Sequence, residues 1–405
     1  MEKKKVLIVS HFMEIGGAER ALLGLLSGFD YEKYDVSLFL FRHEGELLPL
    51  IPQQVRLLPE IPSYTALACP VMEVVKKGQI LLAASRVIGK VSAKIYNRLH
   101  RYSSDSQVEI EYSHKYTKWL MQKITPEVTY DLAISFLTPH YFVAEKVSAR
   151  KKIAWIHTDY SYIEIDVKSE EKMWGSYDNI VAISESCGQS FARRFPGLQE
   201  KLLQIENLLA VDFLKEQAKE TISEPFGNEK RIILLSVGRF SNAKNFDNIP
   251  EICRKILEKG IPVVWYLIGF GTDEALIQSK IQENEMEEHV ILLGKKENPY
   301  PYLAGCDWYI QPSRYEGKAV TVREAQALHK PVIITDYPTA KSQLTDGYDG
   351  VIVPMDNDSC ANAIAEILEN VELKNRLIRN TYKVDYSNRD EMQKLYALMG
   401  ESHDT

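Results

Sequence analysis

The sequence predicts an α/β fold with two doubly wound domains, each a parallel sheet covered by helices on both faces. Strand-length apolar runs without polar alternation recur in both halves, and stretches of helix length separate them. The series of strands restarts after residue 227, and 405 residues are enough for two domains that each bury a core. Strand type, spacing and chain length therefore all indicate the same fold class.

The first half opens with a buried strand over 6–10, a Gly-Gly turn and a helix over 18–29. Further strands are expected at 36–41, 131–136, 153–156 and 179–183. These runs are apolar throughout, which is typical of parallel strands buried on both faces.

The second half repeats this pattern. Strands are expected at 231–237, 263–268, 290–293, 308–310, 331–334 and 350–353, with helices at 247–259, 272–283, 317–328 and 358–370. We therefore expect an N-terminal domain over 1–210, a second domain over 211–370 and a linker near 208–228. Residues 371–405 are expected to form C-terminal helices, and whether these return to the first domain stays open.

Composition excludes several classes of protein. With 49 Lys and Arg against 56 Asp and Glu, the chain has a net charge of −7, which disfavours general nucleic-acid binding. Five scattered cysteines without a Cys-x-x-Cys pair argue against structural zinc and for a reducing, cytoplasmic location. No apolar run reaches the roughly 18–20 residues that span a bilayer, and the N-terminus reads as a first strand rather than a signal peptide.

Basic residues concentrate between residues 71 and 123, where there are ten Lys or Arg and only four Asp or Glu. Apolar residues recur there at helical spacing with basic residues between them. The apolar positions are Leu81, Leu82, Val87, Ile88, Val91, Ile95 and Leu99, and the basic positions are Lys77, Arg86, Lys90, Lys94 and Arg98. Two alternatives stay open: the apolar stripe faces the core, or the helix over 77–101 lies on an anionic membrane surface.

The most informative motif holds two glutamates, Glu316 and Glu324, between the end of a strand and the start of a helix. Eight residues of α-helix correspond to about 12 Å of rise and roughly 80° of rotation. Carboxylates at that separation suit opposite ends of one extended ligand, and they cannot share a proton or a metal ion. The alternative is a pair of solvated glutamates on a helix.

Two more motifs follow strands of the second half. Gly238-Arg239 with Lys244 combines a close backbone approach with two cations that can neutralise a diphosphate. Gly269-x-Gly271 follows the next strand, and nucleotides bind at this edge of open α/β sheets. Each motif alone also fits an ordinary turn.

The first half contributes two candidates. Gly16 and Gly17 join the first strand to its helix, where backbone N–H groups and the helix dipole favour an anion. His157 ends another strand at its carboxyl edge. A plain turn and a structural histidine are the alternatives.

In this order and at these strand ends, the motifs resemble the glycosyltransferases of family 4. The resemblance implies a GT-B fold, in which a Rossmann-like acceptor-side domain over 1–210 faces a Rossmann-like nucleotide-sugar-binding domain over 211–370 across a cleft. It also implies sugar transfer with retention and without a metal ion. It also implies a nucleoside-diphosphate sugar as donor, with uridine as the default base, and no separate cofactor.

The resemblance also implies roles for individual residues. Arg239 and Lys244 would bind the diphosphate and stabilise the leaving nucleotide. Glu324 would bind the ribose, Glu316 the donor sugar, and His157 a sugar hydroxyl or the reacting centre. The full donor-binding set would be Gly16, Gly17, Gly238, Arg239, Lys244, Gly269, Glu316, Gly317, Lys318, Ala319, Val320 and Glu324.

Two positions depart from the family pattern. Lys318 and Ala319 stand where the family often has Phe-Gly, and we expect Lys318 to contact the donor phosphate or an anionic sugar, a solvated lysine being the alternative. Asn245 stands where glycine is common, and asparagine tolerates left-handed backbone.

The expected function is transfer of a sugar to a glycan or lipid-linked acceptor in capsule, exopolysaccharide or cell-envelope assembly, on the inner face of the membrane. The alternative is a catalytically silent partner subunit that binds a nucleotide sugar or glycan. A nicotinamide-dependent dehydrogenase would have the same kind of parallel sheet, but it would need a Gly-x-Gly-x-x-Gly loop, which is missing after the first strand.

Overall fold

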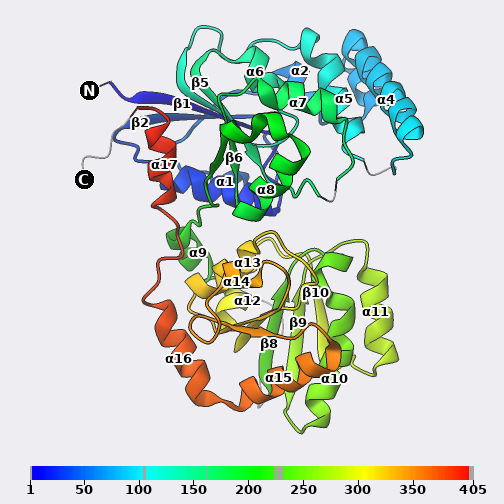
Figure 1. Cartoon of the computed structure of the whole chain (residues 1–405), viewed down its shortest axis with the longest axis vertical. Helices are drawn as coiled ribbons and strands as arrows, with labels where there is room; N and C mark the ends of the chain where they lie inside the picture. Colours follow the sequence, from blue (N-terminus) through cyan, green and yellow to red (C-terminus); the bar gives the residue numbers. More distant parts are fainter. Residues whose placement is uncertain (1, 104–105, 162, 223–225, 227–230, 401–405) are drawn as a thin grey trace. The chain divides into compact units, whose positions relative to one another are not determined.

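The computed structural model describes residues 2–103, 106–161, 163–222, 226 and 231–400, which form two compact units. The first unit runs to Leu208 and includes the segment from Asn388, and the second unit is Leu209–Ser387. In each unit a central sheet is flanked by helices (Figure 1). The prediction of two doubly wound α/β domains is confirmed.

All paired strands of the first sheet are parallel, in the order β3-β2-β1-β4-β5-β6-β7. Their bounds are β1 (Lys4–Ser10), β2 (Tyr34–Leu40), β3 (Arg56–Leu57), β4 (Tyr130–Ser135), β5 (Ala149–Ile156), β6 (Asn179–Ala182) and β7 (Leu202–Gln204). Sequence reasoning missed β3 and β7 because both are short and neither contains a buried residue.

Both faces of this sheet are buried. In β1, Val6 and Ile8 belong to one apolar cluster, and Leu7 and Val9 belong to another on the opposite face. The helices that cover the two faces and the outer part of the unit are α1 (Gly17–Gly28), α2 (Pro62–Thr65), α3 (Val71–Lys76), α4 (Ile80–His100), α5 (Val108–Thr117), α6 (Tyr141–Lys146), α7 (Val167–Gly175), α8 (Glu185–Arg194) and α17 (Glu391–Ala397).

The second sheet is also parallel, in the order β10-β9-β8-β11-β12-β13. Its strands are β8 (Ile232–Val237), β9 (Val263–Ile268), β10 (Val290–Gly294), β11 (Trp308–Gln311), β12 (Val332–Thr335) and β13 (Val351–Val353). Its helices are α9 (Val211–Gln217), α10 (Ile249–Glu258), α11 (Glu274–Glu283), α12 (Tyr300–Gly305), α13 (Val320–Ala327), α14 (Ala340–Gln343), α15 (Asn357–Glu369) and α16 (Val371–Thr381). Every strand expected from the sequence is present in the two sheets.

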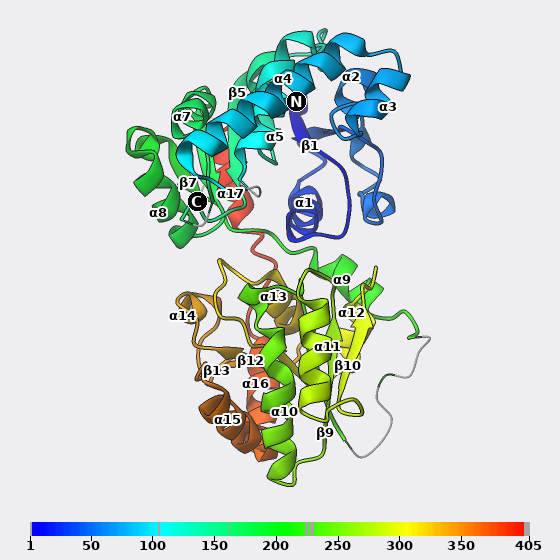
Figure 2. The same cartoon turned by 90° about the vertical axis from the view of Figure 1, so that its right-hand side faces the viewer.

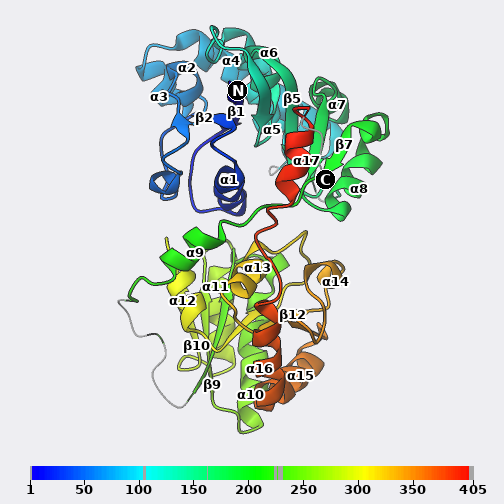
Figure 3. The ribbon, with the colours of Figure 1, turned by 90° about the vertical axis from the view of Figure 1, so that its left-hand side faces the viewer.

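The two C-terminal helices belong to different units. Helix α16 lies in the second unit, whereas α17 packs in the first unit, as Figure 3 shows. Leu395 is fully buried there, and Tyr396 stacks on Tyr34 with ring centroids 4.5 Å apart. The hydroxyl of Tyr396 also accepts a hydrogen bond from the backbone N–H of Asp30 at 3.0 Å.

Helix α4 (Ile80–His100) accounts for nearly all of the basic stretch over 77–101, and Gly78, whose φ is +75°, separates it from α3, which ends at Lys76. Helix α4 packs against α5, and Gly89 allows this approach, since a Cβ there would lie 2.9 Å from the carbonyl oxygen of Tyr112 (Figure 2). Of the apolar stripe only Leu82 is buried. The other members are exposed: Leu81, Val87, Ile88, Val91, Ile95 and Leu99. The alternative in which the apolar stripe faces the core is therefore wrong for this helix.

The burial of α17 predicts that the stability of the first unit depends on the end of the chain. We expect Leu395→Ala to lower the free energy of unfolding by about 2–5 kcal/mol, as for other large-to-small core changes. The exposed Gln393 on the same helix provides the control Gln393→Ala, for which no change is expected. Differential scanning calorimetry would measure both, and equal melting profiles would contradict the docking of α17.

Candidate functional site

The candidate donor site of the second unit lies where its sheet changes direction of winding. The strands β8 and β11 are neighbours in the sheet. From β8 the chain continues to β9 and β10 on one side, and from β11 it continues to β12 and β13 on the other side. Ligands of open α/β sheets bind outside the carboxyl ends of the strands at such a point. The loop with Gly238, Arg239 and Lys244 follows β8, and the loop with Glu316 follows β11.

An ion pair joins these two loops. The ammonium group of Lys244 lies 2.5 Å from the Glu316 carboxylate, and both side chains are largely buried, at 20% and 11% exposure. The same carboxylate accepts hydrogen bonds from Ser313 Oγ at 2.6 Å and Gln311 Nε2 at 3.3 Å. Lys244 and Glu316 are therefore held as one polar cluster, whereas Arg239, on the same loop as Lys244, is exposed.

A second ion pair, which sequence reasoning missed, braces the same two loops. Arg314 donates from both terminal nitrogens to Asp247, at 2.9 and 2.7 Å, and also to the carbonyl oxygen of Asn242. The backbone N–H of Arg314 donates to the carbonyl oxygen of Ala243 at 2.8 Å. A bidentate pair restricts geometry more than a single contact does, so Arg314 positions the loop that carries Lys244.

Glu324 is fully buried on α13, and its Oε1 accepts a hydrogen bond from the Tyr300 hydroxyl at 2.9 Å. Glu316 lies in the loop before that helix, so the helical rise and rotation expected between the two glutamates do not apply. Burial raises the pKa of the Tyr309 phenol, and the charges of Glu316 and Glu324 raise it further.

The glycines of this edge have different roles. A Cβ at Gly269 would lie 1.9 Å from the carbonyl oxygen of Gly238, and one at Gly271 would lie 2.2 Å from that of Phe240. The loops after β8 and β9 therefore touch through their backbones, which accounts for these two glycines without a ligand. In contrast, no atom of the described residues, apart from Gly317 itself and its two chain neighbours, lies within 4 Å of a Cβ placed at Gly317.

The segment Gly317–Val320 leads into α13, which begins at Val320 rather than at residue 317. The N–H of Ala319 already donates to Gln343 Oε1 at 2.7 Å. Gln343 Nε2 and the Tyr337 hydroxyl are buried there with no hydrogen-bond partner among the described residues, and no sequence motif marked either. Asn245 has a φ of +60°, which confirms the expected left-handed backbone.

The loop after β1 in the first unit carries Gly16 and Gly17 at the start of α1. The carboxylate of Glu19 folds back over this helix N-terminus, since a Cβ at Gly16 would lie 2.1 Å from Glu19 Oε2. A glutamate at this position is typical of a helix cap. Gly17 is open: apart from its chain neighbours and the backbone of its own helix, no atom in the described part of the chain lies within 4 Å of the place where its Cβ would be.

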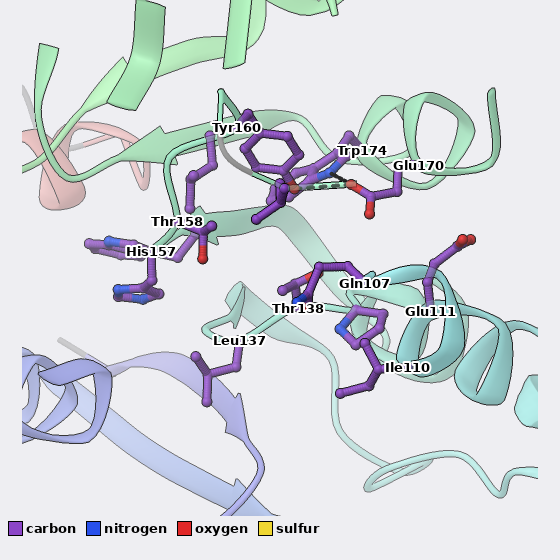
Figure 4. A pocket seen from close by; sticks show the side chains of 14 residues that line it. Gln107, Ile110, Glu111, Leu137, Thr138, His157, Thr158, Tyr160, Glu170 and Trp174 are labelled. Carbon is purple, nitrogen blue, oxygen red and sulfur yellow. Dashed lines mark hydrogen bonds between the residues drawn. The ribbon is translucent and has the colours of Figure 1, made fainter. Parts of the chain in front are cut away.

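His157 follows β5 and lines a pocket of the first unit (Figure 4). Burial lowers its pKa to about 3, against a hydrogen bond to the backbone of Phe136 that raises it. Its Nε2 has no hydrogen-bond partner among the described residues. At neutral pH His157 is therefore an uncharged imidazole, suited to hydrogen bonding rather than to neutralising phosphate.

The structure thus gathers Gly238, Arg239, Lys244, Glu316 and Glu324 at one edge of the second sheet. Gly16, Gly17 and His157 belong to the first unit. Lys318 is half-buried and engaged in an interaction, so a simply solvated lysine does not describe it.

The two kinds of glycine predict different outcomes on substitution. Gly269→Ala should lower the free energy of unfolding by about 1–3 kcal/mol, because its Cβ collides with backbone rather than with a flexible side chain. Gly317→Ala should leave stability within about 0.5 kcal/mol of the parent value. Thermal unfolding of both variants would measure this difference, and equal melting temperatures would contradict the backbone contact between the two loops.

Comparison with known proteins finds a matching family model and several relatives. Residues 218–384 match the family described as "Glycosyl transferases group 1". An N-acetylgalactosaminyltransferase of Campylobacter jejuni that acts on a diphospho-undecaprenol-linked sugar is 27% identical over 199 residues, 49% of this chain and 52% of that protein. An uncharacterised glycosyltransferase of Methanocaldococcus jannaschii is 23% identical over 185 residues, 46% of its length. The chain therefore spans about half the length of these curated relatives.

Solved structures match nearly the whole chain. HepE of Anabaena, in complex with UDP and glucose, has a TM-score of 0.64 at 16% identity and covers 97% of this chain and 98% of its own. TarM, solved from S. aureus as a mutant with fondaparinux, α-GlcNAc-glycerol and UDP, has a TM-score of 0.66 at 13% identity and covers 98% of this chain. The two parallel sheets and these neighbours identify the fold as GT-B, and residues 218–384 match the glycosyl transferases of group 1.

Proposed function

We propose that the protein is a retaining glycosyltransferase of the family 4 type that uses a nucleoside-diphosphate sugar, with UDP as the nucleotide. The acceptor is a glycan or a lipid-linked sugar in capsule, exopolysaccharide or cell-envelope assembly. The observation that carries this proposal is the Lys244–Glu316 pair at the switch point of the second sheet, with Arg239 exposed on the same loop as Lys244. A relative named as an N-acetylgalactosaminyltransferase and structural neighbours solved with UDP support it.

The chemistry follows from charge. Breaking the bond between sugar and diphosphate leaves negative charge on the departing nucleotide, which nearby cations stabilise. Arg239 and Lys244 would supply that stabilisation, Glu324 would bind the ribose hydroxyls, and Glu316 would bind a hydroxyl of the donor sugar. The diphosphate would compete with Glu316 for Lys244, so donor binding would loosen an ion pair that the chain already makes.

Retention of configuration is carried over from the resemblance. Double displacement needs a carboxylate next to the anomeric carbon, and the sequence marks no such nucleophile. We therefore propose a front-face displacement in which the leaving phosphate takes the proton of the acceptor hydroxyl. Independence from metal ions is carried over in the same way.

We also propose that α4 places the protein on an anionic membrane surface, where a lipid-linked acceptor would be found. Its exposed apolar residues include Leu81 and Leu99, at 74% and 75% exposure, and Ile95 at 56%. Lys94 and Arg98 are exposed on the same helix. An apolar face bordered by cations matches the chemistry of an acidic lipid surface. No helix among the described residues is both long and apolar enough to cross a bilayer.

Nucleotide binding is the first test. UDP at about 100 times its dissociation constant should add about 2.7 kcal/mol of stability to the unit that binds it. Arg239→Ala should weaken UDP binding by about ten-fold or more, because a charge-assisted hydrogen bond contributes roughly 1.5–3 kcal/mol. Arg239 is exposed, so its removal should not change the melting temperature of the free protein. Thermal shift and calorimetric titration would measure both effects.

Arg379→Ala on α16 is the matched control, since Arg379 is also an exposed arginine of the second unit. If UDP, GDP, ADP and dTDP all failed to bind, the proposed donor site would be wrong. If UDP bound but no UDP-sugar were turned over with any acceptor, the silent partner subunit would become the better description.

Membrane binding is tested with vesicles. We expect the protein to float with phosphatidylglycerol vesicles but not with phosphatidylcholine vesicles, and to dissociate as salt rises. The double variant Ile88→Ser with Ile95→Ser should lose most of this binding. The control Val371→Ser, which changes an exposed apolar residue on α16, should keep it. Dimerisation through α4 without vesicle binding, measured by light scattering, would mean that a second copy covers this face.

A further inference from the structure

Gln311 is a fully buried glutamine at the carboxyl end of β11, five residues before Glu316. No sequence motif pointed to it. An amide that is buried without hydrogen bonds lowers the stability of a fold, so the partners of a buried glutamine show what holds it there.

The amide of Gln311 forms hydrogen bonds at both of its ends. Its Oε1 accepts from the hydroxyl of Tyr309 on the same strand and from Thr321 Oγ1 on α13, the latter at 3.2 Å. Its Nε2 donates to Ser313 Oγ at 2.8 Å and to Glu316 Oε1 at 3.3 Å. An amide offers two acceptor and two donor positions, so the full hydrogen-bonding capacity of Gln311 is used.

The neighbours of this amide determine its orientation. In the opposite orientation its carbonyl oxygen would face the Glu316 carboxylate, and two acceptors would meet without a proton between them. Ser313 Oγ donates its own proton to Glu316 Oε1 at 2.6 Å, so it accepts from Gln311. Gln311 therefore directs two donors toward one carboxylate oxygen, the first directly and the second through Ser313.

The carboxylate of Glu316 is held through Oε1 alone. Lys244 Nζ, Ser313 Oγ and Gln311 Nε2 all donate to this oxygen. Within the described ranges, none of the hydrogen bonds or ion pairs of Glu316 ends on Oε2, and the side chain keeps 11% of its surface exposed. The protein thus uses one oxygen of this carboxylate and leaves the other for a ligand.

The backbone of this segment is fixed as well. Thr339 Oγ1 donates to the carbonyl oxygen of Glu316 at 2.8 Å, and Thr335 Oγ1 donates to that of Ser313 at 2.6 Å. With the main chain held, the direction of Oε2 depends on the donors that keep Oε1 turned toward the protein. A diphosphate would compete for Lys244, whereas the fully buried Gln311 lies out of reach of a ligand and keeps its hydrogen bonds.

We propose that Gln311 is the positioning residue of the donor-sugar contact. It keeps Glu316 Oε1 turned toward the protein, and Oε2 toward the sugar, when the diphosphate draws Lys244 away. This inference rests on the proposed function and adds to it a rule for the donor sugar. Because a carboxylate oxygen only accepts hydrogen bonds, the sugar presents a hydroxyl or an amide N–H to Oε2.

The experiment is calorimetric titration of the full chain with UDP, UDP-glucose, UDP-galactose, UDP-N-acetylglucosamine and UDP-N-acetylgalactosamine. Gln311→Leu removes the hydrogen bonds of the amide and introduces a side chain of similar size. We expect the Kd of the tightest-binding UDP-sugar to rise at least five-fold in this variant, whereas the Kd of UDP changes less than two-fold.

Gln326→Leu is the matched control, and it should leave the ratio of the two Kd values unchanged. Gln326 is also a buried glutamine of the second unit, but its Nε2 donates to the carbonyl oxygen of Asp349. If Gln311→Leu disturbs the fold, Thr321→Val provides a milder change, because it removes one of the two donors that orient the amide. We expect it to raise the ratio at least two-fold.

A double-mutant cycle separates positioning from a general loss of structure. In a Glu316→Ala background, Gln311→Leu should have no further effect on the ratio of Kd values, because the carboxylate that it orients is gone. A purely structural role would give the same effect in both backgrounds, and that result would overturn the inference.

Two further results would overturn it. One is an unchanged ratio in whichever of Gln311→Leu and Thr321→Val folds. The other is a parent protein that binds UDP but no UDP-sugar, since no sugar contact would then exist to be positioned. Failure of the parent protein to bind UDP itself would instead contradict the proposed function, so the two failures are distinguishable.

Discussion

Parallel strand pairing is the constraint from which the sites of this protein follow. Because the paired strands of each sheet run in one direction, their carboxyl ends share an edge, and the loops that leave that edge are brought together from distant parts of the chain. In the second unit, β8 and β11 are neighbours although a long stretch of sequence, with two other strands in it, separates them. The opposite winding of their crossover helices leaves room between the two loops, and that is where Lys244 meets Glu316.

Paired charges keep those loops in place without a ligand. Arg314 and Asp247 form a bidentate contact across the same two loops that Lys244 and Glu316 connect. Each of these two cations is thus held by a carboxylate. Arg239 differs from this set because it is exposed, so a ligand would gain its charge without first breaking a buried pair. In the proposed function, Arg314 positions the loops and Arg239 contacts the ligand.

The first unit uses burial instead of paired charge. Desolvation keeps the histidines His11, His114, His140 and His157 neutral, and it raises the pKa of Glu170. Burial of these groups lowers the stability of the fold, because each group loses the hydration of its charged form. Their concentration near the carboxyl ends of β1, β4 and β5 is typical of a binding site, since a fold gains nothing from them elsewhere. The exposed apolar face of α4 is the second feature of this unit that a binding partner would explain and that the stability of the fold does not require.

The sequence alone was sufficient for the buried strands, the fold class and the residues at the ends of those strands, because buried parallel strands are apolar and their loops follow directly in the chain. It missed the short strands β3 and β7, neither of which contains a buried residue. It also indicated the left-handed backbone at Asn245, which depends on one residue type. It did not reveal Arg314, Gln343 or the pocket that His157 lines. Their roles arise from contacts between segments that are far apart in sequence, and no local spacing encodes such contacts. The face that α4 presents was undecided for the same reason: periodicity defines an apolar stripe, but only packing against α5 determines which side of the helix is covered.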